Sequence, residues 1–109
     1  MSWPVAELPA DLRAAMRRAG NGEPAFRPGH ALEVVAWLLD RGRPVLGGEI
    51  YEQVGDVEWG TYRAAWETTP PRRPGEGWDV YGARACEQAR DAIAPWRAVA
   101  GVRVYVAPG

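Results

Sequence analysis

Three segments of the chain place apolar residues at every third or fourth position, which is the spacing of one face of a helix. These segments cover residues 11–19, 31–39 and 78–93. A residue that ends helices follows shortly after each of them: Gly20, Gly42 and Pro95. The pattern therefore predicts three helices, and the second, which is the more apolar, is expected to lie against a sheet.

Residues 44–51 have a different pattern, because their apolar residues do not follow a helical period. Gly47 and Gly48 would weaken a helix interior, so we expect a strand with a bend or bulge at these glycines. Gly55-Asp56 suggests a hairpin turn, after which the strand pattern continues through Trp66. A short helical turn is the competing interpretation of this last stretch. Valines alternate with other residues over 102–107 and predict a closing strand.

Residues 68–77 contain three prolines and two glycines, which disfavour regular pairing and predict an extended surface loop. We interpret Arg72-Arg73 within it as part of a solvated turn, with a contact element as the alternative. Strands and helices do not alternate regularly along the chain, which favours helices segregated to one side of a sheet. Residues 1–109 are therefore expected to form a single α+β domain, with three helices packed on one face of a small, mostly antiparallel sheet.

Charge and composition exclude several classes of protein. Thirteen basic residues, all arginine, and fourteen acidic residues give a formal net charge of −1, which offers no broad field for a nucleic-acid backbone or an anionic membrane. No apolar run is long enough to cross a bilayer, and the first residues lack the basic and apolar regions of a signal peptide. The single Cys86 cannot form an intramolecular disulfide. These features predict a cytoplasmic protein that binds neither nucleic acid nor membrane.

The sequence carries no catalytic or metal-binding pattern that we can identify. Gly47-Gly48 has neither the spacing of a dinucleotide fingerprint nor the ending of a P-loop. His30 is the only histidine and is expected in the first turn of the second helix, partly exposed. Cys86 has no second cysteine or histidine partner at a metal-binding or catalytic spacing. We therefore expect a protein that is not an enzyme and that holds no cofactor or metal.

The aromatic residues point instead to a contact surface. Six tryptophans and four tyrosines occur in the chain, and these two residue types are enriched at interfaces. In the middle of the chain they are interleaved with carboxylates, an arrangement that suits a basic partner protein. The candidate contact residues are Glu49, Tyr51, Glu58, Trp59 and Trp66. By helix phase, Trp37 and Trp78 are expected mainly inside, whereas Trp59 and Trp66 are expected to be partly exposed.

Two other functions remain open at this point. One is a module that binds a small molecule or peptide in an aromatic cleft formed by Trp59, Tyr62 and Trp66. The other is a small enzyme that uses the mid-chain carboxylates, among them Glu49, for general acid–base catalysis. The same carboxylates also fit a merely solvated face of a sheet, which is the commoner role for such residues.

Three motifs together suggest a family. They are the strand Pro44-Val45-Leu46-Gly47-Gly48-Glu49-Ile50-Tyr51, the later Trp66, and Gly77-Trp78 opening a helix that carries Ala85, Ala89 and Ile93. Over roughly residues 31 to 94 the chain resembles the immunity protein 40 family of bacterial polymorphic toxin systems. The resemblance implies a non-enzymatic α+β protein, encoded beside a toxin gene, that binds and neutralises its cognate toxin domain in the producing cell.

Overall fold

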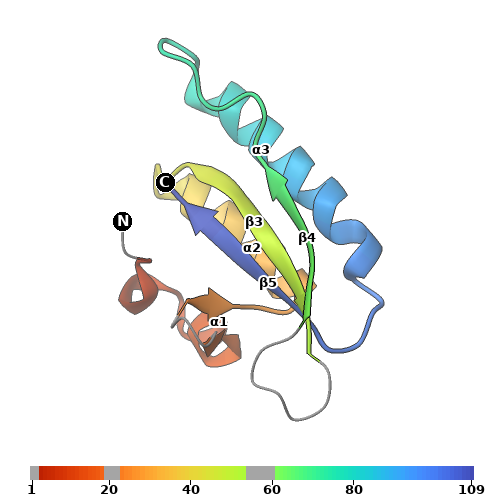
Figure 1. The fold of residues 1–109 in the computed structure, drawn as a ribbon. Helices are drawn as coiled ribbons and strands as arrows, with labels where there is room; N and C mark the ends of the chain where they lie inside the picture. Colours follow the sequence, from red (N-terminus) through yellow and green to blue (C-terminus); the bar gives the residue numbers. More distant parts are fainter. Residues whose placement is uncertain (1–2, 19–22, 54–60) are drawn as a thin grey trace.

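The computed structural model describes residues 3–18, 23–53 and 61–109 (Figure 1). Among them are three α-helices, two short 3-10 helices and five strands. The helices are η1 (Val5–Glu7), α1 (Ala10–Ala15), α2 (Pro28–Asp40), α3 (Trp78–Ile93) and η2 (Ala94–Trp96). The strands are β1 (Arg17–Arg18), β2 (Pro24–Ala25), β3 (Val45–Glu52), β4 (Thr61–Glu67) and β5 (Val102–Pro108).

The main sheet has three antiparallel strands in the order β4-β3-β5, so that β3 pairs with both neighbours. The two-residue strands β1 and β2 pair with each other in a separate small sheet. A bridge between Phe26 and Val104 joins the end of this small sheet to the outer side of β5. The predicted α+β class and antiparallel sheet are therefore confirmed.

The core lies between one face of the main sheet and the helices α2 and α3; in Figure 1, α2 lies behind β3 and β5, and α3 runs beside β4. From β5, Val102, Val104 and Val106 are each at most 1% exposed. Burial of one such aliphatic side chain stabilises the fold by roughly 1.5–3 kcal/mol. The helix α3 contributes small buried residues, Ala85 and Ala89, which let its backbone approach the neighbouring elements.

The predicted irregularity at the glycines of β3 is present. The pairing of β3 with β5 skips a residue between Val45 and Gly47, which is the mark of a bulge. Gly47 has φ 149°, in the region that favours glycine, and a Cβ there would overlap the carbonyl oxygen of Trp66. The neighbouring Gly48 pairs with Trp66 across the strands, and its missing side chain leaves room for the indole ring.

The outer edge of β5 is covered by residues near the beginning of the chain. The backbone N–H groups of Phe26 and Val104 each donate a hydrogen bond to the other residue's carbonyl oxygen. The indole Nε1 of Trp3 donates to the carbonyl oxygen of Val106 at 2.8 Å. The ring of Trp3 also stacks on Trp37 with 6.5 Å between the ring centroids. Trp3 and Phe26 thus protect part of an edge that would otherwise expose unpaired backbone groups.

The proline-rich segment 68–77 is an extended loop, as predicted, and it is held against α3. The guanidinium of Arg84 donates two hydrogen bonds to the carboxylate of Glu76, at 2.6 and 2.9 Å, and a third to the carbonyl oxygen of Pro70. A two-pronged pair of this kind fixes orientation as well as position. Within the loop, Arg72 lies over the ring of Trp78, and both arginines of the predicted turn are exposed.

Two local predictions differ from the structure or lie outside it. The first helix ends at Ala15 and not at Ala19, because Met16 is extended and the next residues pair as β1 with Pro24 and Ala25. The predicted hairpin turn at Gly55-Asp56 lies outside the described residues. The strand interpretation of residues 61–66 is confirmed by β4, and the closing strand by β5.

Candidate functional site

The face of the main sheet opposite α2 and α3 carries a group of tyrosines around a carboxylate. Alternation along β3 turns Glu49 and Tyr51 to this face, while Ile50 between them is buried. The register places Tyr105 of β5 opposite Glu49 and Tyr62 of β4 opposite Tyr51. We call these four residues the tyrosine–glutamate patch. No described helix covers it, and Tyr62 is 56% exposed.

Within the patch, a hydrogen bond from the Tyr51 hydroxyl to the Glu49 carboxylate fixes both side chains. This hydrogen bond, together with burial and the negative charge of Glu49, raises the pKa of Tyr51 to about 12. The ring of Tyr62 meets that of Tyr51 edge to face, with 5.9 Å between centroids and 73° between planes. The patch is therefore an ordered cluster that keeps a neutral phenol beside a carboxylate.

The electrostatic character of the patch is set by carboxylates. Burial is the main cause that raises the pKa of Tyr105, and the charges of Glu23 and Glu49 add to it. The charge of Glu23 also contributes to the raised pKa of Tyr51. Both phenols thus lie in the negative field of the same two side chains, which is the environment that attracts a cationic group.

A hollow of about 340 Å³ adjoins the patch on the same face. Small residues make it, because Gly47, Ala65 and Ala107 project little or nothing from neighbouring strands. Tyr62, Tyr105, Glu49 and Glu67 are among the residues that line it. A long side chain from a partner would fit such a hollow, and an arginine or lysine would meet both carboxylates and aromatic rings there.

Two groups that could take part in chemistry, the Tyr51 hydroxyl and the Cys86 thiol, both have raised pKa values. The Tyr51 hydroxyl donates its hydrogen bond to the Glu49 carboxylate, and its pKa of about 12 keeps the phenol protonated near neutral pH. Among the described residues, no group of three or more histidine, cysteine or acidic side chains is placed to hold a metal ion. Elsewhere, burial raises the pKa of the Cys86 thiol, which lowers its reactivity.

The structure brings together only some of the residues that the sequence suggested. Glu49 and Tyr51 lie in direct contact within the patch. Trp66 is half-buried and packs against the core, with its Nε1 buried and without a hydrogen-bond partner among the described residues. Glu58 and Trp59 lie outside the described residues. Trp37 and Trp78, expected mainly inside, are half-buried and pack against the core.

Sequence reasoning missed Tyr105 as a member of the site. The alternation that predicts the last strand also places Tyr105 on the face opposite the three valines, so the signal was present. Its position beside Glu49, however, depends on β5 pairing with β3, which are about fifty residues apart in the chain. Spacing along the sequence does not reveal such a partner.

In comparison with known proteins, no protein-family model, no curated protein and no solved structure matches this chain. In the part of the chain that the structure describes, none of the helices has the length and apolar character needed to cross a bilayer. Its function has to be argued from the site itself.

Proposed function

We propose that this protein binds a basic partner protein through the tyrosine–glutamate patch. The observation that supports this proposal is the contact cluster of Glu49, Tyr51 and Tyr62 on a face that no described helix covers. Tyrosines contribute strongly to protein interfaces because each ring buries a large area with few rotatable bonds. Here the hydroxyl of Tyr51 is already held by Glu49, so ordering that ring on binding costs less.

The partner we propose is the cognate domain of a bacterial toxin, and the protein is an immunity protein that neutralises it. The resemblance of residues 31–94 to the immunity protein 40 family supports this more specific form. In this mechanism the patch covers the active surface of the toxin, with carboxylates against its cationic residues and aromatic rings as anchors. The immunity protein itself carries out no reaction, and it acts in the cytoplasm of the producing cell.

The proposal is tested by co-expression with the C-terminal domain encoded by the neighbouring gene, with growth rescue and co-purification as readouts. Binding variants are Tyr62→Ala and Glu49→Gln, and the matched control is Val80→Ala on α3, whose side chain is 61% exposed. We expect the patch variants to weaken binding at least about tenfold, because tyrosine anchors carry much of an interface's energy. The control is expected to bind like the unaltered protein.

Two results would count against this proposal. Toxicity without rescue by the unaltered protein would exclude this partner, and rescue that all three variants retain would place the interface elsewhere. Circular dichroism and thermal unfolding of each variant separate lost binding from lost folding.

The hollow beside the patch favours a second candidate function, a module that binds a small cationic ligand or peptide. The rings of Tyr62, Trp66 and Tyr105 contribute to its lining together with Glu49. A screen of cationic metabolites and arginine-containing peptides by thermal shift tests it, because a ligand specific to the folded state raises the melting temperature. A rise that Tyr62→Ala abolishes would support this function, and no rise at millimolar ligand would reject it.

A further inference from the structure

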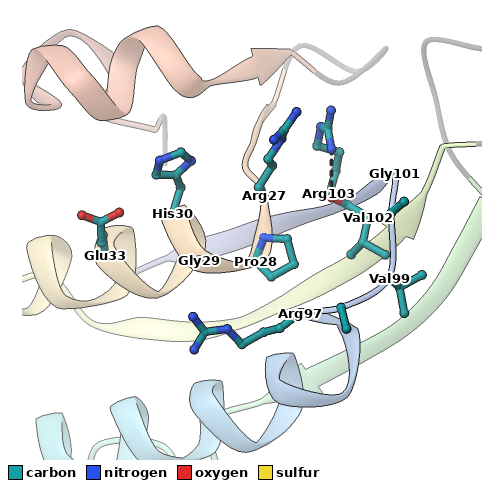
Figure 2. A pocket seen from close by; sticks show the side chains of 12 residues that line it. Arg27, Pro28, Gly29, His30, Glu33, Arg97, Val99, Gly101, Val102 and Arg103 are labelled. Carbon is teal, nitrogen blue, oxygen red and sulfur yellow. Dashed lines mark hydrogen bonds between the residues drawn. The ribbon is translucent and has the colours of Figure 1, made fainter.

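Away from the patch, the surface is hollowed at the beginning of α2 and between α2 and α3. The first hollow is a cleft of about 920 Å³, lined in part by Arg27 and Arg103. In Figure 2 both arginine side chains extend away from Pro28 and Val99, so the cleft does not present its charged and apolar residues to one ligand. The second hollow, of about 540 Å³, is lined by residues within 36–42 of α2 and its end and within 78–86 of α3. We call it the helix groove.

Small residues leave the helix groove open. Gly82 and Ala83 of α3 and Ala36 of α2 line it, and a Cβ on Gly82 would meet nothing within 4 Å. At one end the indole Nε1 of Trp78 donates a hydrogen bond to the carbonyl oxygen of Leu39 at 3.1 Å, which joins the two helices there. Small side chains on such a surface let another helix approach to about 8 Å between the axes.

The charges along the groove are separated by sign. Asp40, the last residue of α2, and Asp79, in the first turn of α3, line the end at which Trp78 joins the helices. Arg90 is in the last turn of α3. Burial raises the pKa of the Cys86 thiol in the groove, and the nearby charge of Arg90 opposes this rise. The ion pairs formed among the described residues include none of these three charged side chains.

The acidic end of the groove is electrostatically unfavourable in the isolated chain. The C-terminal end of a helix carries a partial negative charge, and the last turn of α2 contains Asp40 but no basic residue. The neighbouring Arg41 donates its hydrogen bond to Glu7, at 2.8 Å. A cation from another molecule would therefore be stabilised beside Asp40 and Asp79.

A second copy of α3 supplies such a cation when it lies antiparallel to the first. Asp79, Ala83, Cys86 and Arg90 are exposed or half-buried and recur every three or four positions, so they lie along one side of α3. Their spacing is symmetric, because Asp79 and Arg90 are equally far from the midpoint between Ala83 and Cys86. A two-fold axis at this midpoint places Asp79 opposite the partner subunit's Arg90 and Ala83 opposite the partner subunit's Cys86.

We propose that two copies of this chain associate through their α3 helices, packed antiparallel along the helix groove. Arg90 of each copy lies beside the carboxylates of Asp79 and Asp40 in the other. Nine described residues line the groove, fewer than the roughly 20–30 per side of a standard interface, so we expect a weak dimer with a Kd on the order of 10–100 μM. The tyrosine–glutamate patch lies on the opposite face of the sheet, and the dimer does not depend on the function proposed above.

The test is sedimentation of the full chain in the analytical ultracentrifuge, at concentrations from about 1 μM to about 1 mM. We expect the average mass to rise from the monomer value of 12.0 kDa toward twice that value. Ala83→Arg puts a long charged side chain at the centre of the contact and should keep the protein monomeric. The matched control is Ala14→Arg, on the exposed side of α1, which should associate like the unaltered protein. Circular dichroism checks that both variants fold.

Charge variants test the antiparallel register. Asp79→Arg and Arg90→Asp each place like charges opposite one another in a dimer of identical chains, and each should weaken association about tenfold or more. Mixed in equal amounts, the two variants should associate again, because positions 79 and 90 then carry opposite charges at both contacts. Mixing would not restore association if either residue acted only within its own chain.

The single cysteine reports the contact directly. In the antiparallel arrangement the Cys86 residues of the two copies lie on either side of the two-fold axis, within reach of a short bismaleimide cross-linker. We expect cross-linked dimers of the unaltered protein at mildly alkaline pH, which compensates for the raised pKa of the thiol. Ala83→Arg should prevent the cross-link.

Three results would overturn the proposal. They are a monomer at every concentration, a dimer that Ala83→Arg does not disrupt, and charge variants that do not associate when mixed. Toxin neutralisation by Ala83→Arg, measured in the co-expression assay, is expected to be unchanged. The dimer and the partner-binding function can therefore fail independently of each other.

Discussion

The six-membered ring of Trp66 occupies the space into which a side chain at position 48 would project. A Cβ on Gly48 would overlap the Cη2 and Cζ3 atoms of that ring and also the carbonyl oxygen of Tyr105. The indole can lie across β3 only because β3 has a glycine opposite it. The two residues thus act as one packing unit, although they are eighteen positions apart in the sequence.

Replacing Gly48 by alanine is expected to destabilise the protein. The added methyl group forces both the indole and a backbone carbonyl to move, and overpacking of this kind typically costs about 1–3 kcal/mol. Urea unfolding measures the change. Gly82→Ala is the matched control, because a Cβ at Gly82 in α3 meets nothing within 4 Å and alanine favours a helix by roughly 1 kcal/mol. A stabilised Gly48→Ala variant would contradict the packing described.

Trp66 and Tyr62 lie on the same strand but should respond differently to truncation. Trp66→Ala removes a ring that packs against the core and is expected to lower the free energy of unfolding by about 3 kcal/mol. Tyr62→Ala removes a side chain that is 56% exposed and should cost less than about 1 kcal/mol. Thermal and urea unfolding of both variants compare them. Equal losses would mean that Tyr62 is part of the core.

The hydrogen bond between Tyr51 and Glu49 predicts a pH effect in the alkaline range. The pKa of Tyr51 is raised from 10.0 to about 12, so the folded protein holds this proton more tightly than the unfolded chain does. Its contribution to stability is complete below pH 10 and is lost as the pH rises toward 12. Absorbance titration of the tyrosinates follows the group. In Glu49→Gln the pKa of Tyr51, identified as the titration that is missing in Tyr51→Phe, should fall, and an unchanged value would contradict the assignment.

Glu76 predicts the opposite dependence in acid. The hydrogen bonds from Arg84 lower its pKa from 4.5 to about 2, so its stabilising effect is present above pH 4.5 and is lost as the pH falls toward 2. Chemical unfolding across this range measures the slope. Glu76→Gln should flatten the slope, while Glu87→Gln on the exposed side of α3 should leave it unchanged. Equal slopes in the unaltered protein and Glu76→Gln would contradict the assignment.

The sequence predicts the elements that depend on a local pattern of apolar residues, but it does not predict the contacts between segments that lie far apart in the chain. The period of residues 78–93 predicts α3 with both of its bounds, and the glycine pair predicts the bulge of β3. By contrast, Met16 ends the first helix early because the next residues pair with Pro24 and Ala25, a contact that helical spacing does not encode. The candidate site shows the same contrast. Glu49 and Tyr51 lie on one strand and were predicted from the sequence, whereas Tyr105 joins them only because β5 pairs with β3.

The covered edge of β5 has a consequence for how this protein is made. The strand β5 supplies three core valines, pairs along β3 and also receives Phe26 and Trp3 from the beginning of the chain. The residues of β5 are synthesised after all the segments that they contact. Until residues 102–108 are made, the main sheet can form only its β3–β4 pair, and the core lacks the three valines of β5. Closure of the core therefore depends on residues 102–108, which come later in the chain than every segment that they contact.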